Sequence, residues 1–494
     1  MKKRLAAALL LAVFCTGGAR AQQNNLPDLG DISSASLSDT QERTIGNRIM
    51  REVRNDPAFL DDPEITDYIT SVGQRLLSVA DNPPPDITFF MVKDESINAF
   101  AMVGGHVFIH TGLLVLTQDE AELAGVMAHE LAHVLQKHQA RMMRDASRGQ
   151  WTSLAALAVA LLAARSSANS SGQLTEAALA SASAFNIQNQ LDYTREHERE
   201  ADRVGFTLLD RAGYDPRGMA TFFERMMRAN RLNELKGTTP SYLRTHPMTT
   251  ERIAEMQDRL EKMPPRILAP DSIEYKIAKA RIRALMMGSS ADAEHFFKVA
   301  LEDATVLRPR EDVYGLALAQ RRAHDLDAAW KTLQPLRVQG RTHPAFELLA
   351  GQILADMHKN DESLAVYRTA LKTWPGYRAL AYAYLDQLLQ MGRAKEAIAD
   401  LEDRIRTRSD DWRLYELQAR AYEATGAALL QHRAQAESYY RRGNLAAAVD
   451  QLEIALKFRK GSDFYEMSIA ESRLRELRTA LENERAAEKA LKIS

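Results

Sequence analysis

The run GVMAHELAHVLQKH carries two histidines and a glutamate at a spacing suited to metal chemistry. In a helix each residue advances by about 100°, so His129 and His133 lie on one face and both imidazoles can bind one ion. Glu130 would then flank the ion as a general base. The spacing predicts a helix that binds zinc at the core of a metallopeptidase, but it supplies only two protein ligands.

A catalytic zinc normally has three protein ligands and one water, so a third donor is needed. His138 is five residues beyond His133 and is rotated by about 140° from its face in a continuous helix, so we interpret it as a surface residue or a support for a ligand. A better donor lies in the segment REHEREAD. Glu198 and Asp202 are four residues apart there, so one carboxylate can bind the metal while the other orients a ligand imidazole. Spacing alone does not choose between Glu198 and Glu200.

HELAH, preceded by NAFAMVGGHVFIHTGLL and followed by EREADRVG, resembles the zinc metallopeptidase family that includes the CAAX prenyl endopeptidases and their soluble bacterial relatives, which are gluzincins. The resemblance covers nearly the whole chain that follows Ala21. In the ExxxD motif of that family the glutamate is the third zinc ligand and the aspartate supports a ligand. These positions correspond to Glu198 and Asp202. The resemblance therefore implies one Zn²⁺ per chain, held by His129, His133 and Glu198.

A loop histidine is the expected regulator of this site. The resemblance implies that His246, in SYLRTHP, occupies the fourth zinc position and displaces the catalytic water, so the enzyme stays latent until the loop moves. Arg252, on the following helix, is a weaker candidate for steadying the oxyanion, and an ordinary salt bridge is the alternative.

The strand around Asn98, Ala99 and Phe100 is the expected binding site for substrate. An extended peptide that pairs with it gains main-chain hydrogen bonds without a demand for a particular sequence. In the family this edge strand runs beside the metal helix, whereas the alternative is an internal strand with no free edge. His106 and His110 share a strand face with Phe108, and we interpret both as non-ligands.

The N-terminus predicts export. Lys2, Lys3 and Arg4 precede the apolar run Leu5 to Phe14, and Ala19-Arg20-Ala21 is a small-x-small signal, so residues 1–21 are expected to be a signal peptide cleaved after Ala21. Cys15 is the only cysteine, which leaves the mature chain no thiolate or disulfide and restricts zinc to His, Glu and Asp. This pattern suits the periplasm. A formal net charge of -2 argues against nucleic acid as a partner.

Residues 22–270 are expected to form an α+β metallopeptidase domain that is mostly helical. Helices are predicted over 41–54, 63–80 and 118–143, and β-rich runs over 87–92 and 106–110, with a hairpin turn at Gly104-Gly105. The uncharged segment Trp151 to Ala164 is too short to span a membrane. It is either a buried core helix or a lid that contacts a membrane surface or a client protein.

Residues 271–494 are expected to form an all-α domain built from repeats. DAAW at 327, DESL at 361 and KEAI at 395 recur at equal spacing, a pattern that resembles tetratricopeptide repeats, whose period is about 34 residues. A later unit at 446 follows its counterpart at 395 by more than one period, which indicates about one extra helix. Such repeats stack into a solenoid whose concave face binds peptides or proteins. A plain helical bundle is the alternative.

The combination of signal peptide, peptidase and repeats resembles periplasmic members of this family. It implies that the repeats engage the outer-membrane β-barrel assembly machinery and its unfolded or stalled clients, including the lipopolysaccharide-transport barrel, and it allows peripheral contact with the outer membrane. The enzyme would degrade stalled barrels and promote the maturation of others. The alternative is a non-proteolytic chaperone or adaptor with a plugged zinc site, and the intact Glu130 favours catalysis.

Overall fold

The structure is a computed structural model that describes residues 39–145, 195–234, 241–265, 269–303, 309–338, 342–458 and 464–493. The predicted signal peptide and the segment Trp151 to Ala164 lie outside these ranges. None of the described helices is long and apolar enough to cross a bilayer.

A small sheet is the only β-structure with named strands in the described ranges. It contains β1 (Thr88–Val92), β2 (Ala99–Met102) and β3 (His106–His110) in the order β1-β3-β2. β1 pairs with β3 in parallel, and β2 pairs with β3 antiparallel. Gly104 and Gly105 form the turn between β2 and β3 with φ values of 91° and 82°, which confirms the predicted hairpin. Glycine suits both positions because an L side chain is strained at positive φ.

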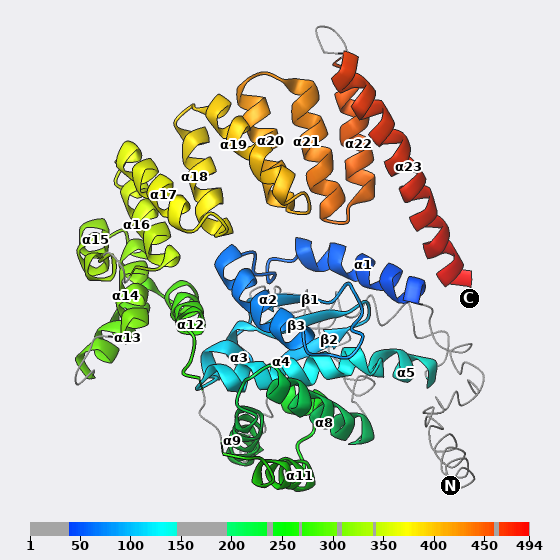
Figure 1. The fold of residues 1–494 in the computed structure, drawn as a ribbon, viewed down its shortest axis with the longest axis vertical. Helices are drawn as coiled ribbons and strands as arrows, with labels where there is room; N and C mark the ends of the chain where they lie inside the picture. The colour runs from blue at the N-terminus through cyan, green and yellow to red at the C-terminus, as the bar shows by residue number, and fades with distance from the viewer. Residues whose placement is uncertain are drawn as a thin grey trace, which may run out of the picture.

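Helices surround this sheet (Figure 1) and form two hydrophobic clusters with it, a large one and a smaller one that contains Ile49, Val53 and Phe108. The helices of this region are α1 (Asp39–Asn55), α2 (Pro63–Leu77), α3 (Thr111–Leu116), α4 (Glu120–Leu135), α5 (His138–Asp145), α8 (Arg195–Arg211), α9 (Arg217–Glu234), α10 (Ser241–Thr245) and α11 (Thr250–Glu261). Nearly every residue of α4 is buried, so this helix runs through the centre of the region. The predicted α+β class, mostly helical with a small sheet, is confirmed.

The metal helix is shorter than the sequence indicated. One helix over 118–143 was expected, but α4 ends at Leu135 and α5 begins at His138, so that prediction is wrong. Lys137 between them has a φ of 51°, in the left-handed region, which ends the helical hydrogen-bond pattern and redirects the chain. The break carries no glycine or proline, the residues that would have signalled it.

The C-terminal region is entirely helical over the residues described. It contains α12 (Ile273–Met286), α13 (Ser290–Asp303), α14 (Arg310–Arg322), α15 (Leu326–Leu333), the short 3-10 helix η3 (Gln334–Leu336), α16 (Pro344–Asp356), α17 (Asn360–Thr373), α18 (Arg378–Gln390), α19 (Ala394–Thr407), α20 (Trp412–Ala424), α21 (Ala428–Arg441), α22 (Leu445–Ala455) and α23 (Phe464–Ile493). The predicted all-α second region is confirmed.

A constant period organises these helices. α14, α16, α18 and α20 begin at 310, 344, 378 and 412, and the helices that follow them, α15, α17, α19 and α21, begin at 326, 360, 394 and 428. The period therefore continues one unit further than the aligned motifs. α22 starts at Leu445, 33 residues after α20, so the helix starts keep the period, but two helices (α20 and α21) instead of one separate α22 from α19, the preceding helix that carries the motif. This added helix accounts for the wider spacing of the later unit.

The helical region curves over the N-terminal region as an arc that starts at α12 and ends at α23 (Figure 1). α12 joins the two regions because it has a face in each core: Tyr275, Ala278 and Ile282 belong to the core around α4, while Ile277 and Ala280 pack against α14 and its neighbours. The far end of the arc returns to the first described helix, where Arg51 of α1 is paired with Glu484 of α23.

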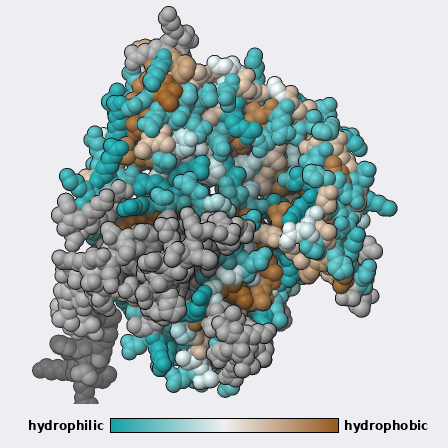
Figure 2. Space-filling model, turned by 180° about the vertical axis from the view of Figure 1, so that it is seen from behind, coloured by the Kyte–Doolittle hydropathy of each residue, from teal (hydrophilic) through white to brown (hydrophobic). Residues whose placement is uncertain are grey.

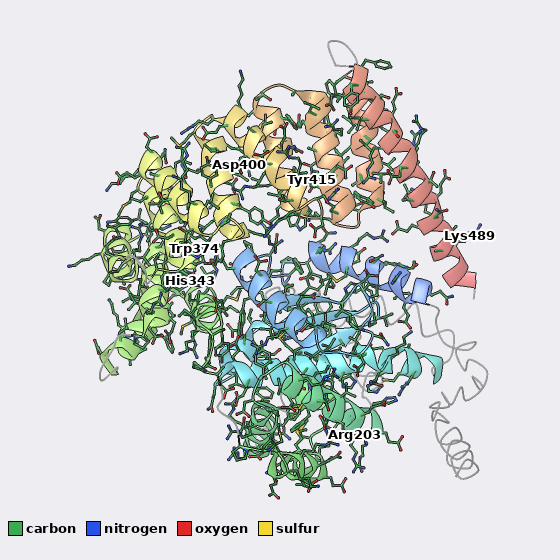
Figure 3. All side chains as sticks on the ribbon, in the orientation of Figure 1. Arg203, His343, Trp374, Asp400, Tyr415 and Lys489 are labelled. Carbon is green, nitrogen blue, oxygen red and sulfur yellow. The ribbon has the colours of Figure 1, made fainter. Side chains whose placement is uncertain are left out.

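The surface of the helical region is mostly hydrophilic where it can be seen. Figure 2 shows hydrophobic residues there only in small, separate groups. Exposed charged side chains such as Arg203 of α8 and Lys489 of α23 point away from the body of the molecule (Figure 3).

Candidate metal centre

α4 presents His129, Glu130 and His133 in the middle of the N-terminal core. Asp119 caps the helix by accepting a hydrogen bond from the backbone N–H of Glu122, which anchors its first turn. The side chains of His129, Glu130 and His133 are fully buried. The Nε2 atoms of the two histidines lie 3.0 Å apart, so both imidazoles point at the same place. This is the shared helix face that the four-residue spacing predicts.

α8 packs closely against α4 and adds a carboxylate. A Cβ at Gly205 would lie 3.1 Å from the backbone of Ala128, so the small residue permits the close approach of the two helices. Glu198 is 1% exposed, and its oxygens lie 3.5 Å from His129 Nε2 and 3.4 Å from His133 Nε2. Glu200 points elsewhere and pairs with Arg141, so the tertiary structure brings Glu198 rather than Glu200 to the two histidines.

His246 reaches the same point from the segment after α10. The backbone N–H of Tyr242 donates to the carbonyl of Ile97, which ties α10 to the segment just before β2. His246 Nδ1 lies 2.9 Å from Glu198 Oε1 and 3.4 Å from His129 Nε2, while its Nε2 lies 3.4 Å from Glu130 Oε1. The imidazole therefore stands between the two glutamates, beside the two histidines.

Asp202 and Arg252 contact the outer side of the cluster and hold its side chains in place. Asp202 Oδ1 lies 3.1 Å from His129 Nδ1, on the side of the ring away from the other histidine. Arg252 of α11 holds both oxygens of Asp202 at 2.6 and 2.7 Å and also contacts Glu198 Oε2 at 2.7 Å. The same guanidinium donates to the carbonyl oxygen of Pro247, directly after His246. One arginine thus connects α8, α11 and the loop of His246, and the structure places it in salt bridges.

His138 supports the second histidine. Because the helix breaks at Lys137, His138 returns to the cluster, where it is fully buried and its Nδ1 lies 2.9 Å from His133 Nδ1. Its Nε2 lies 3.1 Å from Glu200. The rotation argument from a continuous helix excluded His138 as a zinc ligand, but it could not reveal this contact. No sequence signal marks the break that creates it.

Burial and neighbouring charges shift the acidities here in opposite directions. Burial raises the pKa of Glu130, although His246 and His129 oppose the shift. Burial alone would also raise the pKa of Glu198, but His246 and hydrogen bonds with His129 and His133 outweigh it and hold that pKa well below its usual range. The two shifts favour the anionic form of Glu198 and bring Glu130 closer to taking up a proton, as a general base must.

The cluster fits a metal ion. One ligand atom from each of His129, His133, Glu198 and His246 can be chosen so that all lie within 4.8 Å of one another, and all four residues are buried. Neither carboxylate oxygen of Glu130 has a hydrogen-bonding side chain as partner. Buried nitrogens and carboxylate oxygens that converge in this way are what a divalent cation with nitrogen and oxygen ligands requires.

The structure places the predicted substrate strand beside the cluster. β2 packs against α4, and the backbone of Ala101 lies close enough to Glu130 to lower its pKa, so the strand runs beside the carboxylate. β2 pairs with β3 on one side only and is an edge of the sheet as far as the described residues extend. Asn98 and Ala99 are buried, and Phe100 stacks on Phe108 with ring centroids 5.1 Å apart.

His106 and His110 lie on the sheet and not in the cluster. His106 Nδ1 is 2.7 Å from the hydroxyl of Thr88, and His110 Nδ1 is 2.9 Å from that of Ser96. Neither belongs to the group of side chains that can share an ion.

Two histidines one helical turn apart, a glutamate between them and a carboxylate from a second helix define the active-site class of a metallopeptidase. Comparison with known proteins agrees with this class. Residues 63–260 match the model of peptidase family M48. The match begins at α2 and ends in α11, so it contains the whole cluster.

Similarity to individual proteins extends further along the chain. Over 462 residues the chain is 33% identical to the beta-barrel assembly-enhancing protease of Escherichia coli (strain K12), with 92% of each chain covered. It is 41% identical over 268 residues, 54% of each chain, to a putative beta-barrel assembly-enhancing protease of Vibrio cholerae. The chain belongs to peptidase family M48, and it is a metalloprotease.

A further relative matches only about half of the chain. The metalloprotease LoiP of Escherichia coli is 27% identical over 263 residues, which cover 96% of that protein but 52% of this chain. About half of this chain therefore matches nearly the whole of LoiP.

Proposed function

We propose that the protein is a periplasmic zinc endopeptidase that acts in the assembly of outer-membrane β-barrel proteins, degrading stalled barrels and promoting the maturation of others. The convergence of His129, His133 and Glu198 beside Glu130 carries the catalytic part of this proposal. Similarity along 92% of the chain to a relative named for β-barrel assembly supports the choice of substrate.

Zinc is the proposed ion, with His129, His133 and Glu198 as its ligands. Zinc accepts imidazole nitrogens and carboxylate oxygens, and three protein ligands leave one position for chemistry. A bound zinc ion would supply Lewis-acid activation of water and of the scissile carbonyl.

The remaining steps belong to side chains of this chain. Glu130 takes the proton of the attacking water and passes it to the leaving amine, a task that its raised pKa suits. The carboxylate of Asp202 lies 3.1 Å from His129 Nδ1 and would fix the orientation of that ring, so we assign it a positioning role. Arg252 positions Asp202 and Glu198, and its salt bridges to both favour this role over direct contact with an oxyanion.

His246 is the proposed plug. Its Nδ1 faces Glu198 and its Nε2 faces the proposed base, Glu130, so the imidazole fills the space that a water and a scissile bond need. Release of the segment from Ser241 to Pro247 would remove the plug and open the site. Substrate would then pair with β2 at Asn98, Ala99 and Phe100, close to Glu130.

We further propose that residues 1–21 are a signal peptide, 22–270 the peptidase domain and 271–494 a tetratricopeptide-repeat domain. The constant period of the helix starts supports the repeat assignment. Partners would be the outer-membrane β-barrel assembly machinery and unfolded or stalled barrel proteins, bound by the repeats. Export after cleavage at Ala21 would bring the enzyme to them.

Cleavage of an unfolded outer-membrane barrel protein by the purified mature chain, loaded with zinc, tests the proposal. Glu130→Gln should keep bound zinc, measured by mass spectrometry of the metal, and should reduce cleavage by about 100-fold or more because a general base is lost. Glu482→Gln, an exposed site on α23, is the matched control. Undiminished cleavage by Glu130→Gln would contradict the assignment of the base.

The same assay separates the plug from its alternatives. His246→Ala should raise cleavage if the imidazole blocks the site, while the exposed control His295→Ala should leave it unchanged. Unchanged or lower cleavage by His246→Ala would mean that this residue is structural or catalytic instead. A wild-type chain and a His246→Ala chain that both bind unfolded barrels without cutting them would favour the adaptor.

A further inference from the structure

A cavity of about 190 Å³ lies where the helical arc meets the N-terminal region, away from the metal centre. Its walls come from α1, the turn after it, α2, β1, α18, α20 and the end of α21. In Figure 3 side chains from both regions project into the space between α1–α2 and α18–α21. The lining residues that matter for the argument are Arg54, Phe59, Phe90, Trp412 and Arg442, together with two Arg–Asp pairs.

The two pairs account for four of the charges at this cavity. Arg413 is paired with Asp61, and its guanidinium also donates to the carbonyl of that residue at 3.0 Å. Arg378 lies 3.7 Å from Asp411 and is also paired with Asp67 of α2. These contacts tie the arc to the N-terminal region and leave no spare acid among the lining residues.

Arg54 and Arg442 are the remaining charges. Neither forms an ion pair with a carboxylate in the described part of the chain, and both are half-buried. Arg54 donates a hydrogen bond at 2.7 Å to the carbonyl oxygen of Arg442, which holds the two cationic residues together. Burial and then the charge of Arg442 lower the pKa of Arg54, and the charge of Asp61 only partly offsets them.

The end of α21 accounts for the contact of Arg54, because a cationic side chain that donates to a carbonyl at a helix C-terminus is favourable. It supplies neither guanidinium with a carboxylate. Two positive charges that line one cavity without a counter-ion repel each other, and an anionic group bound there would relieve this repulsion. The cavity therefore suits an anionic group.

Aromatic rings line the same cavity. The guanidinium of Arg442 lies 4.8 Å from the ring centre of Trp412, and Phe59 and Phe90, from the N-terminal region, pack together with centroids 5.8 Å apart. Arg54 lies 6.0 Å from the ring centre of Phe90. A ligand in this cavity would contact the faces of these aromatic rings and the guanidinium groups of Arg54 and Arg442.

We propose that this cavity binds a carboxylate of a client polypeptide together with the aromatic side chain next to it. Guanidinium forks match the planar geometry of a carboxylate, and the rings offer stacking to the neighbouring side chain. The volume is below the roughly 300–1,000 Å³ of sites that hold whole small ligands, so it suits one residue of a longer chain. The site goes beyond the proposed proteolysis and involves none of its residues.

The carboxylate has two sources with the same chemistry, the end of a chain or an Asp or Glu side chain. Calorimetric titration distinguishes them with three unlabelled probes, each added to the full mature chain carrying Glu130→Gln so that no probe is cut. One probe is acetyl-Gly-Ser-Gly-Ser-Phe with a free carboxylate, the second is the same peptide amidated, and the third is amidated with Asp before Phe. Binding of the first alone assigns the chain terminus, and binding of the first and third assigns any carboxylate beside an aromatic residue.

Variants test the residues. Arg54→Gln and Arg442→Gln should each weaken binding of the free-carboxylate peptide by about tenfold, which corresponds to about 1.4 kcal/mol. Arg475→Gln removes an exposed arginine of α23 as the matched control and should leave the affinity unchanged. Because every sample carries Glu130→Gln and only binding is measured, the outcome is independent of whether the metal site cuts proteins.

A second readout covers variants that fold poorly. Peptide binding should change the fluorescence of Trp412. This change is obtained by subtracting the signal of the Trp412→Phe variant from that of the chain with Trp412, both with Arg54 and Arg442 intact. Absence of binding by all three probes would overturn the proposal. So would equal affinity of the free and amidated peptides without Asp, or binding of phosphatidylglycerol vesicles that no peptide displaces.

Discussion

Arg252 offers the sharpest test of how the metal centre is held together. It is 3% exposed and is the cation between two buried carboxylates, Asp202 and Glu198, at 2.6 to 2.7 Å. Arg252→Met keeps much of the length of the side chain and removes the charge and the hydrogen bonds. The carboxylates then remain buried without their cation.

The magnitude follows from the burial of all three groups. Removal of one partner from a buried ion pair costs about 3–5 kcal/mol, because the partner left behind is not hydrated. In metal-free protein we expect the free energy of separating α8 and α11 from α4 to fall by this amount. Bound zinc should reduce the loss, since the cation then shares the charge of Glu198.

Hydrogen exchange followed by mass spectrometry measures this loss at the right place. Tryptophan fluorescence is less suitable, because three of the four tryptophans, Trp330, Trp374 and Trp412, lie in the helical arc. Amides of α4 and α8 should exchange about 150- to 5,000-fold faster in the metal-free Arg252→Met protein, if opening is at equilibrium. Amides of α20 should be unaffected.

Arg259→Met is the matched control, since Arg259 lies on the same helix, is 35% exposed and is paired only with Glu255 one turn away. An exposed pair of this kind contributes about 0.3–0.5 kcal/mol. If the two variants exchanged alike, or if Arg252→Met accelerated α4 and α20 equally, Arg252 would not be the local support that its contacts indicate.

Three further outcomes are expected. His138→Ala should weaken zinc binding by about 10- to 100-fold, measured by competition with a chelating dye, because His133 loses the contact that orients its ring, and His295→Ala should not. Asp202→Asn should weaken zinc binding by a similar factor through His129; an unchanged affinity would remove its positioning role. Removal of zinc with a chelator should abolish cleavage and lower the melting temperature of the peptidase region. Zinc at about 100 times its dissociation constant adds about 2.7 kcal/mol to the free energy of unfolding, and restored zinc should reverse both effects.

Local pattern was sufficient for the elements that carry the chemistry. The two histidines of α4 share a face because their spacing matches a helical turn, and the Gly104-Gly105 turn forms because only glycine is relaxed at two successive positive φ values. The regular recurrence of small and apolar residues likewise predicted where α15, α17 and α19 would lie. These features depend on short, repeated patterns of residues, so the chain alone contains them.

Contacts between distant segments were beyond the reach of spacing. Glu198 and Glu200 are equivalent in a charged run, and only the packing of α8 on α4 turns Glu198 to the histidines and leaves Glu200 to His138 and Arg141. The break at Lys137 also escaped prediction, because neither glycine nor proline marks it.

The sequence by itself determined the class of chemistry, a helical histidine pair with a glutamate base, and the existence of a separate helical region. The tertiary structure decided which side chains surround that pair, His138 and Arg252 among them, and how the arc closes on α1 and α2 to form an arginine-lined cavity. The reason is physical. Helical periodicity depends on residues that are near one another in the sequence. The environment of a charged side chain such as Arg54 depends on Arg442, which is far along the chain and which only folding brings into contact with it.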